Sequence, residues 1–453
     1  MGRPSELEDF LRSQIDEGAK DSSGKFTLSR EKALEKLAAY QLQGGQSWVL
    51  KVIQAVVAAG ASELSVRQTG TDTEFHFSMP EPWLLAEVED AFYDPEVSPN
   101  RSLDHLKRGL WSVSLHNMRP FLLAIPGCPE ALVWTGKALT RGAVAARQSV
   151  LLAVSHRTIF EGKGIPLLRN LEAASGNAEV LAELRDRAFT CSIPLKVDNR
   201  RMDALQACPK YGVSKSSYPV YLAFLGGDLP ELKIPPATFG KYRPQAEGDS
   251  EIAKLFHRQT KLPEKVAVGS LITAHVREVK RGKATVWEAY SMGSCLYWVR
   301  DGVVVDWEHL KTSAACISCA LFVSAEGLAT DLTGLKLARG EAYEDRVEQA
   351  LEILKPFVSS AEVSLEAMIR SQKLAGNVAG GIMLVGAVTL GLMIPIWGLF
   401  LAGGALMTLS QSGSTARALD QNLKRGLERL QQDINRLRPT RLARPYETQK
   451  DGP

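Results

Sequence analysis

The cysteine pair in the run CISC has the spacing of a metal-binding or redox motif. Cys316 and Cys319 supply the two thiols of this motif. The surrounding run AACISCALFV predicts a β-strand, and alternation along a strand places residues three apart on opposite faces. Buried cysteines behave as small, inert hydrophobic residues. We therefore expect both cysteines to be structural thiols.

No other group of residues has the spacing that catalysis or metal binding needs. The loop FEGKGIP, from Phe160 to Pro166, contains glycine and lysine and could meet a phosphate, but it lacks P-loop spacing. The sequence also lacks the aromatic and glycine features of single-stranded nucleic-acid binders. We expect no catalytic residue, no metal site and no nucleic-acid partner. The histidines are scattered without ligand spacing: His76, His105, His116, His156, His257, His275 and His309.

The elements that surround the stretch WVLKVIQAVVAAG follow a defined order. Ser29 caps a predicted helix, REKALEKLAAYQL, and QGGQ ends it. The run from Trp48 to Ala59 predicts a second, very apolar helix that ends at Gly60. ELSVRQ and FHFSM then predict two strands. The order is helix, helix, strand, turn, strand.

This order, with an apolar helix ending in AVVAAGA before a strand of the ELSVR type, resembles the GHKL (Bergerat-fold) superfamily. That superfamily includes heat-shock chaperone ATPases, gyrase-type subunits, mismatch-repair ATPases and histidine kinases. The resemblance implies a Glu on this helix that activates water, and an Asn four residues later that holds Mg²⁺. Lys51 and Ala55 occupy these two places, and Gln54 stands where an Asp is common. A protonated lysine cannot accept a proton, and alanine offers no oxygen to a metal.

The second motif implied by the resemblance is Asp-x-Gly-x-Gly, in which the Asp binds adenine and the glycines let the backbone approach. This chain has SMPEPW at that place, from Ser78 to Trp83, with two prolines and no matching carboxylate. Hydrolysis by the family mechanism is not expected. We expect no cofactor, and ATP is the alternative that the resemblance leaves open. The degenerate pocket positions are Lys51, Gln54, Ala55 and Ser78.

Length and composition predict more than one folded domain. The chain has 453 residues, of which 45% are hydrophobic and 23% charged, and its formal net charge of +3 gives no strong basic field. The predicted fold class is α+β: a degenerate Bergerat-type α/β sandwich at 29–189 and a second, transducer-like α/β domain at 190–337. Residues 1–28 form a polar N-terminal segment without the apolar core of a secretory signal.

Short apolar runs predict the strands of both domains. LWSVSL, FLLAIP and SVLLAVS are strand-like runs of the first domain, and AEVLAELRDRAF predicts a helix after them. IPLKV opens the second domain, whose further strands are expected at YPVYLAFLG, KVAVGSLITAHVREV, ATVWEAYS, CLYWVRDGVVVDW and AACISCALFVS.

The C-terminal third contains a long run without charge. No charged residue occurs from Leu374 to Ala416, and about 20 apolar residues are enough for one membrane span. We expect a transmembrane hairpin at 374–410 that turns near Pro395, because positive residues flank both ends. A buried globular hairpin and a single kinked span are the alternatives. The small and turn residues of the hairpin are Gly376, Gly380, Pro395, Trp397 and Gly398.

Heptad spacing flanks this run on both sides. We expect an amphipathic helix at 338–373 with a kink at Pro356, a heptad helix at 411–438 and a disordered basic tail at 439–453. A hairpin would bring the two helices together as an antiparallel stalk, and the alternative is that both lie on the soluble domains. The apolar positions are Val347, Leu351, Leu354, Val358, Ala361, Leu365 and Met368 before the run, and Leu423, Leu427, Leu430, Ile434 and Leu437 after it.

Three functional hypotheses follow. The first is a non-catalytic, membrane-anchored GHKL-like protein that acts as a scaffold or sensor at the cytosolic face of the inner membrane. Its expected partners are membrane lipid, an unknown protein and a second copy that binds through the C-terminal helices. The second is a switch that binds nucleotide without hydrolysis. The third is a membrane-perturbing effector of stress or phage defence.

Overall fold

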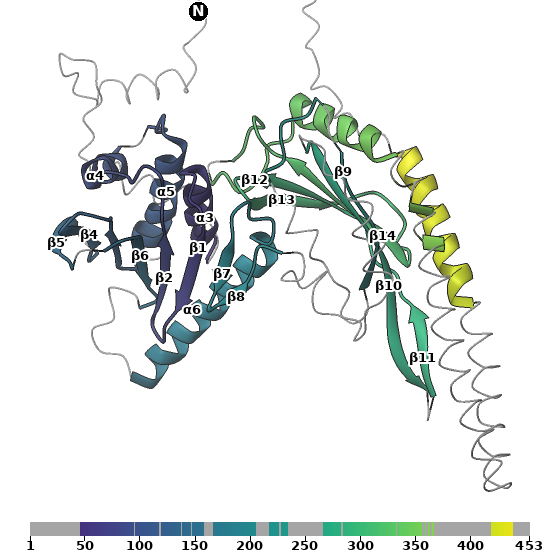
Figure 1. Cartoon of the computed structure of the whole chain (residues 1–453), viewed down its shortest axis with the longest axis horizontal. Coiled ribbons are helices and arrows are strands. Elements are labelled where there is room, and N and C mark those ends of the chain that lie inside the picture. The colour runs from purple at the N-terminus through teal and green to yellow at the C-terminus, as the bar shows by residue number, and fades with distance from the viewer. Residues whose placement is uncertain are drawn as a thin grey trace, which may run out of the picture.

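The computed structural model describes two α/β lobes and two C-terminal helices (Figure 1). The described residues are 46–437, except 95, 117–118, 137, 146, 158–165, 205–216, 226–227, 234–265, 282–283, 332, 356–357, 359–360, 363–364 and 367–417. The predicted helix at Ser29, the loop FEGKG and the hairpin at 374–410 lie outside these residues, as do Gly376, Gly380, Pro395, Trp397, Gly398 and Pro356. No helix in the described part of the chain is long and apolar enough to cross a membrane.

The first lobe is built on a mixed sheet. Its strand order is β5-β4-β3-β6-β2-β1-β7-β8, and the pairing is antiparallel except between β1 and β7. The strands are β1 (Leu64–Gln68), β2 (Asp72–Phe77), β3 (Phe121–Ala124), β4 (Glu130–Trp134), β5 (Leu139–Ala143), β6 (Val150–Ser155), β7 (Leu195–Val197) and β8 (Arg200–Arg201).

Four helices accompany this sheet. They are α3 (Trp48–Ala58), α4 (Leu85–Tyr93), α5 (Arg101–Trp111) and α6 (Pro166–Arg187), and a π-helical turn, η1 (Ser112–His116), continues α5. Helix α3 packs on the sheet through Trp48, whose ring meets that of Phe75 edge-on with centroids 5.8 Å apart. The predicted apolar helix and the two strands after it are confirmed as α3, β1 and β2.

Two predictions for this lobe are wrong. LWSVSL is not a strand, because it forms the end of α5 and the turn η1. Asn100 caps α5 by accepting from the backbone N–H groups of Ser102 and Leu103, which sets the helical period in this run. IPLKV does not open the second sheet either, because β7 pairs with β1. Helix α6 leads into β7, and a helical crossover of this kind allows β7 to pair with β1 in parallel.

The second lobe carries the second sheet. Its strand order is β11-β10-β14-β12-β13, and β9 pairs with the first half of the long strand β10. The bounds are β9 (Ser217–Leu225), β10 (Val268–Arg281), β11 (Ala284–Ala289), β12 (Cys295–Arg300), β13 (Val303–His309) and β14 (Ile317–Ser324). Each of these strands lies in a run for which strand structure is predicted, and β12 and β13 share the run CLYWVRDGVVVDW. Strand β14 is buried along its whole length, which suits a central strand.

Two C-terminal helices lie along the second lobe (Figure 1). The first C-terminal helix spans 341–355, with further helical residues at 358, 361–362 and 365–366, and the second C-terminal helix spans 418–436. Lys424 Nζ donates to Glu366 Oε1 at 3.1 Å, and Gln431 Nε2 donates to the Val358 oxygen at 3.4 Å. Because rising numbers in one helix meet falling numbers in the other, the two helices run antiparallel.

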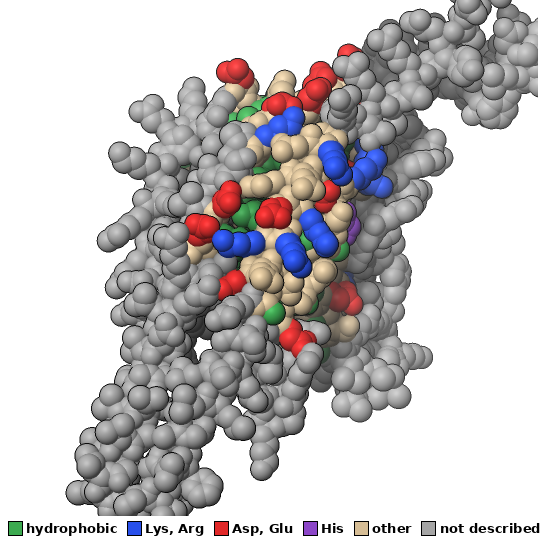
Figure 2. All heavy atoms as spheres, turned by 90° about the vertical axis from the view of Figure 1, so that its right-hand side faces the viewer, with side chains coloured by type: hydrophobic (Ala, Val, Ile, Leu, Met, Phe, Trp, Pro, Cys, Tyr) green, Lys and Arg blue, Asp and Glu red, His purple; other side chains and the backbone are tan. Residues whose placement is uncertain are grey.

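The heptad positions are buried where these helices meet. Leu354, Val358 and Ala361 on the first, and Leu430 and Ile434 on the second, have exposed fractions between 0 and 2%. The second helix also contacts the sheet, since the Cys316 thiol donates to the Asn422 oxygen at 3.1 Å. The helices therefore form an antiparallel pair and also rest on the second lobe. Figure 2 shows this side of the molecule, which carries both acidic and basic side chains.

Candidate functional site

The four degenerate pocket positions divide into a buried group and one surface residue. Lys51, Gln54 and Ala55 lie on helix α3, with exposed fractions of 1, 0 and 0%. Ser78 follows β2 and its side chain is exposed. The apolar sequence around Lys51 explains its burial, because α3 is covered on nearly every side. The helix therefore places a lysine and a glutamine, without a carboxylate, inside the protein.

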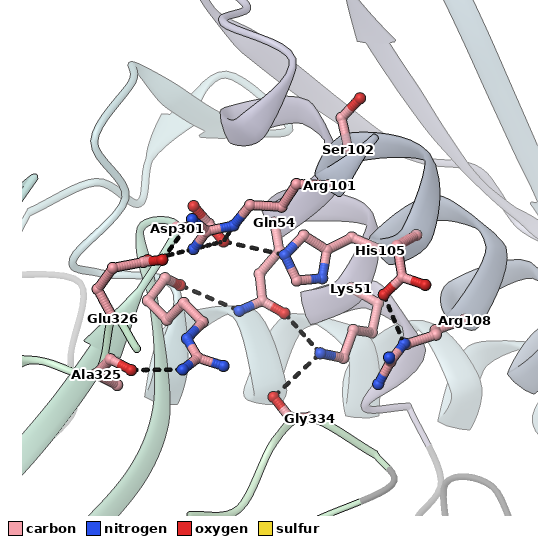
Figure 3. Close-up of polar contacts among 12 residues, drawn as sticks. Lys51, Gln54, Arg101, Ser102, His105, Arg108, Asp301, Ala325, Glu326 and Gly334 are labelled. Atoms are coloured by element: carbon pink, nitrogen blue, oxygen red, sulfur yellow. Dashed lines mark hydrogen bonds and ion pairs between the residues drawn. The ribbon is translucent and has the colours of Figure 1, made fainter. Parts of the chain in front are cut away.

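Lys51 reaches from the first lobe to the second. Its Nζ donates to Gln54 Oε1 at 2.9 Å and to the backbone oxygen of Gly334 at 3.1 Å (Figure 3). Gln54 Nε2 in turn donates to the backbone oxygen of Arg300 at 3.1 Å. We call this set the Lys51 latch: the side chains of Lys51 and Gln54 and the carbonyls of Arg300 and Gly334. It pairs two backbone carbonyl groups of the second lobe, one buried and one partly buried, with donors from α3.

Burial and neighbouring cations weaken the proton affinity of Lys51. Burial is the largest cause, and the positive charges of Arg108 and Arg300 act in the same direction, so the pKa of Lys51 falls to about 7. Asp104 and Asp301 act in the opposite direction but do not compensate. A neutral amine keeps two N–H groups, so both hydrogen bonds of Lys51 persist when the proton is lost.

A second polar group joins the lobes beside the latch. Arg101 Nε donates to Asp301 Oδ2 at 2.9 Å, and its NH1 donates to Glu326 Oε1 at 2.8 Å (Figure 3). His105 Nε2 lies 3.0 Å from Asp301 Oδ2. Helix α5 supplies the arginine and the histidine, whereas Asp301 lies in the turn between β12 and β13 and Glu326 follows β14. One face of α5 thus holds two parts of the second lobe: the turn between β12 and β13, and the residues that follow β14.

The protonation states in this group follow from burial and charge. Burial is the main cause that lowers the pKa of His105. Burial alone would raise the pKa of Asp301, but the hydrogen bond from His105 and the charge of Arg101 hold it below its usual value. The histidine is therefore neutral at pH 7 and donates its Nε2–H to an ionised Asp301. This neutral imidazole and fixed carboxylate form a structural contact between lobes.

Helix α6 completes the junction at its C-terminal end. Arg187 Nε donates to the Val304 oxygen at 2.7 Å, and its NH2 donates to the Val305 and Leu335 oxygens at 2.6 and 3.1 Å. The turn between β12 and β13 also lies against this end, since a Cβ on Gly302 would approach the Ser192 nitrogen to 2.9 Å. Three elements of the first lobe, α3, α5 and α6, therefore contact the same part of the second sheet.

The segment SMPEPW is anchored to the first lobe. The Trp83 ring meets that of Phe77 edge-on with centroids 5.8 Å apart, and its Nε1 donates to Ser102 Oγ at 2.9 Å. Trp83 is only 4% exposed, and Pro80 lies next to Gly60 at the end of α3. An apolar contact and a hydrogen bond to α5 thus hold this segment.

The CISC thiols do not form a pair. Cys319 is buried beside Ser270, with Sγ and Oγ 3.3 Å apart, and burial raises the pKa of its thiol to about 12. Cys316 instead contacts the second C-terminal helix. All cysteines in the described ranges are free. The prediction of a buried thiol is confirmed for Cys319, whereas Cys316 is only partly buried.

The histidines are likewise dispersed. His156 lies 2.7 Å from Thr73 Oγ1, and His275 lies 2.6 Å from Ser318 Oγ. Burial is the main cause that lowers the pKa of both histidines to about 4, so they are neutral at pH 7. Within the part of the chain that the structure describes, no three His, Cys, Asp or Glu side chains are placed to hold a metal ion.

Several residues that complete the contact between the two lobes are not indicated by the sequence. Arg101, Asp301, Glu326 and Gly334 belong to no motif, and their partners lie 200 to 283 residues away along the chain. The dipeptide Asp301-Gly302 was a usable signal for the tight turn, since both residues have positive φ, of 48 and 74°. No pattern in the sequence indicates which distant side chains meet that turn.

Comparisons with known proteins give likenesses of structure only. No protein-family model matches the sequence, and no curated protein matches it. The N-terminal domain of a DNA repair protein is similar in structure, with a TM-score of 0.35 and 9% identity over 76% of this chain and 99% of that chain. The B-subunit of the DNA gyrase from Myxococcus xanthus has a TM-score of 0.39 and 10% identity, covering 73% of this chain and 94% of its own. Likenesses this weak say nothing of activity.

Proposed function

We propose that this chain is a membrane-anchored, non-catalytic GHKL-like protein that serves as a binding scaffold or sensor platform at the cytosolic face of the inner membrane. The observation that carries the proposal is the Lys51 latch. At the position where the resembled family places the residue that activates water, Lys51 donates hydrogen bonds to Gln54 and to Gly334 of the second lobe.

The chemistry of the latch is the reverse of what hydrolysis needs. A general base must accept a proton from water, which requires a free acceptor within hydrogen-bond reach of the water. Lys51 is 1% exposed, and its amine donates to two carbonyl-type oxygens. Ala55, at the place of the family's metal ligand, is fully buried and has no side-chain oxygen. These residues support a structural use of helix α3.

Rigid contact between the lobes supports the scaffold role. Hydrogen bonds and ion pairs from α3, α5 and α6 hold the turn at Asp301 and the loop at Gly334. Two lobes held in this way present one continuous surface to a protein partner. A sensor would act by loosening the same contacts, because they connect the first lobe to the segment that leads into the first C-terminal helix.

The antiparallel C-terminal helices support the hairpin over a single span. Glu366, the last described residue of the first helix, contacts Lys424 in the N-terminal part of the second helix, which starts at residue 418. The intervening chain therefore leaves and returns at the same end of the helix pair. An uncharged segment that enters and leaves on one side of a bilayer is a hairpin, with lipid as its partner.

Nucleotide titration of the full chain in neutral detergent tests the non-catalytic assignment. We expect no saturable heat with ATP and Mg²⁺, and no phosphate release above that of a Lys51→Met preparation purified in parallel. Saturable binding without phosphate release would favour the nucleotide-binding switch. Release that exceeds the Lys51→Met control would contradict the proposal, because this control carries the same contaminants and alters only the latch.

A further inference from the structure

The two C-terminal helices expose stripes of opposite charge. On the first helix, the acidic stripe comprises Glu341, Asp345, Glu348 and Glu352, which are all exposed and are spaced by four, three and four residues. On the second helix, the basic stripe comprises three arginines, Arg425, Arg429 and Arg436, and the neutral Gln432 between the last two; all four are exposed and have the same spacing. Such spacing places each set along one face of its helix.

Most charges in the stripes have no ion-pair partner within the described residues. Glu352 pairs with Lys355 on its own helix. No ion pair among the described side chains includes Glu341, Asp345, Glu348 or any of the three arginines. On both helices the face opposite the stripe is buried through leucines, and Arg429 lies at the side of its stripe that is near Cys316 of the second lobe. Within the described residues, each helix thus offers a row of exposed charge in which Glu352 alone has an ion-pair partner, Lys355.

The contact between the helices fixes where the stripes lie. Because Gln431 meets Val358, the second helix ends near residue 353 of the first, and residues 341–352 extend beyond it. We call the point where the second helix ends beside residue 353 of the first the junction of the two helices. Glu352 and Arg436 are the stripe ends nearest this junction, and Glu341 and Arg425 are the far ends. Figure 1 shows the two helices following one another along the outer edge of the second lobe. Figure 2 views that edge and shows acidic and basic side chains on it.

We propose that the two stripes form a self-complementary interface, in which the acidic stripe of one copy lies along the basic stripe of a second copy. A two-fold axis at the junction places the acidic stripe of each chain beside the basic stripe of the other. Both helices run toward the junction, so the equal spacing sets Glu341 opposite Arg425, Asp345 opposite Arg429 and Glu352 opposite Arg436. Every pair occurs twice, and each stripe is about 16 Å long.

A second copy fits this surface better than a bilayer does. An anionic membrane would attract the basic stripe but repel the acidic stripe, which is as long and lies on the same edge. A second copy supplies the opposite charge for both stripes at the matching spacing. The inference goes beyond the proposed function, since it requires neither an inactive pocket nor a membrane hairpin.

The strength of such an interface should depend on salt. Exposed ion pairs contribute little individually, so the dimer should be weak. Because the screening length falls from about 10 Å at 0.1 M salt to about 3 Å at 1 M, dissociation should accompany rising ionic strength. We expect sedimentation of the full chain in neutral detergent to show dimer at 50 mM salt and monomer at 1 M.

Charge reversal distinguishes this interface from any other. One variant carries Glu341→Lys, Asp345→Lys and Glu348→Lys, and the other carries Arg425→Glu, Arg429→Glu and Arg436→Glu. Each alone should raise the dimer dissociation constant at least about tenfold at 50 mM salt, because like charges then face one another. An equimolar mixture of the two should form a heterodimer. Unchanged self-association of either variant, or no recovery in the mixture, would overturn the proposal.

Disulfide trapping tests the register. Glu348→Cys in one chain and Gln432→Cys in another should crosslink when the two proteins are mixed under mild oxidation. Asn435→Cys is the matched control, since it is exposed on the same helix but lies off the stripe. Equal crosslinking of Glu348→Cys to both positions would show that the stripes do not meet in this register, and would overturn it.

Discussion

Lys51 Nζ donates a hydrogen bond to the backbone oxygen of Gly334, which lies 283 residues further along the chain. The fit is close, because a Cβ on Gly334 would approach that nitrogen to 2.7 Å. Gly334 also has a φ of +62°, which favours glycine. A long cationic side chain on α3 thus meets a loop that offers a carbonyl and no side chain. This pairing connects the lobes at the position where the sequence resemblance led us to look for catalysis.

Removing the amine should destabilise the folded protein at alkaline pH. At pH 9.5 Lys51 is neutral, since its pKa is about 7. Lys51→Met then keeps the apolar stem but leaves the Gly334 and Gln54 oxygens without a donor, at a cost of about 1–3 kcal/mol. Thermal unfolding at pH 9.5 should show a lower midpoint. Lys196→Met, at an exposed position, is the control and should leave the midpoint unchanged.

The penalty of Lys51→Met should shrink as the pH falls from 10 to 7. The pKa of Lys51 is lowered from 10.5 to about 7, so between these values the unfolded chain binds a proton that the folded chain does not. Wild-type stability therefore rises with pH in this window, by up to about 1.4 kcal/mol per unit, and the methionine variant lacks this contribution. Parallel stability profiles of the two proteins from pH 7 to 10 would contradict the buried position of this amine.

Two glycine-to-alanine substitutions test the part of the Lys51 latch that the second lobe provides. Gly334→Ala and Gly327→Ala both place alanine at positive φ, of 62 and 75°, and should share a backbone cost of about 1 kcal/mol. Only the former brings a Cβ against Lys51 Nζ, whereas nothing lies within 4 Å of the Cβ at Gly327. Gly334→Ala should therefore lower the unfolding midpoint more. In a Lys51→Ala background, Gly334→Ala and Gly327→Ala should lower the unfolding midpoint equally. A persistent difference would mean that the added Cβ at position 334 clashes with a group other than Lys51.

Sequence patterns predicted the elements around the site better than the site itself. Apolar spacing and Gly60 were enough to place α3, because a helix and its C-cap are local features. The burial of Lys51 was not predictable, since burial depends on Gly334 and Arg300, which arrive from the second lobe. Long-range pairs of single side chains leave no periodic signal.

The two wrong strand assignments have the same origin. The run containing Trp111 and Val113 alternates locally, but the cap at Asn100 ten residues earlier had already set a helix. The apolar strand at Leu195 looked like the start of a new sheet, although its partner is Leu64 in the first sheet. In both cases a short run fits a strand, and only the position of a distant or preceding element decides where it belongs.

Polar substitution inside the helix pair should separate the two C-terminal helices. Leu427 and Leu430 are each 2% exposed, and a buried, unpaired carboxylate costs several kcal/mol. Cysteines at 366 and 424 replace two long side chains whose ends are 3.1 Å apart, and a bifunctional thiol reagent that spans the length of those side chains should link them in the full chain. Leu427→Asp with Leu430→Asp should abolish that crosslink. Asn422→Asp with Asn435→Asp, at exposed positions on the same helix, should preserve it.

The membrane assignment predicts a specific topology. We expect the chain to fractionate with membranes, and deletion of residues 376–409 to make it soluble, because this run contains no charged residue. The antiparallel contact between Glu366 and Lys424 requires both flanks to lie on the same side. Cysteines at Ser371 and Ser414 should therefore both be protected from an impermeant thiol reagent in intact cells, and both should react after lysis, relative to the parent chain. Labelling of Ser414→Cys alone would indicate a single kinked span and would separate the helix pair. Labelling of both in intact cells would move the two lobes to the opposite side of the membrane.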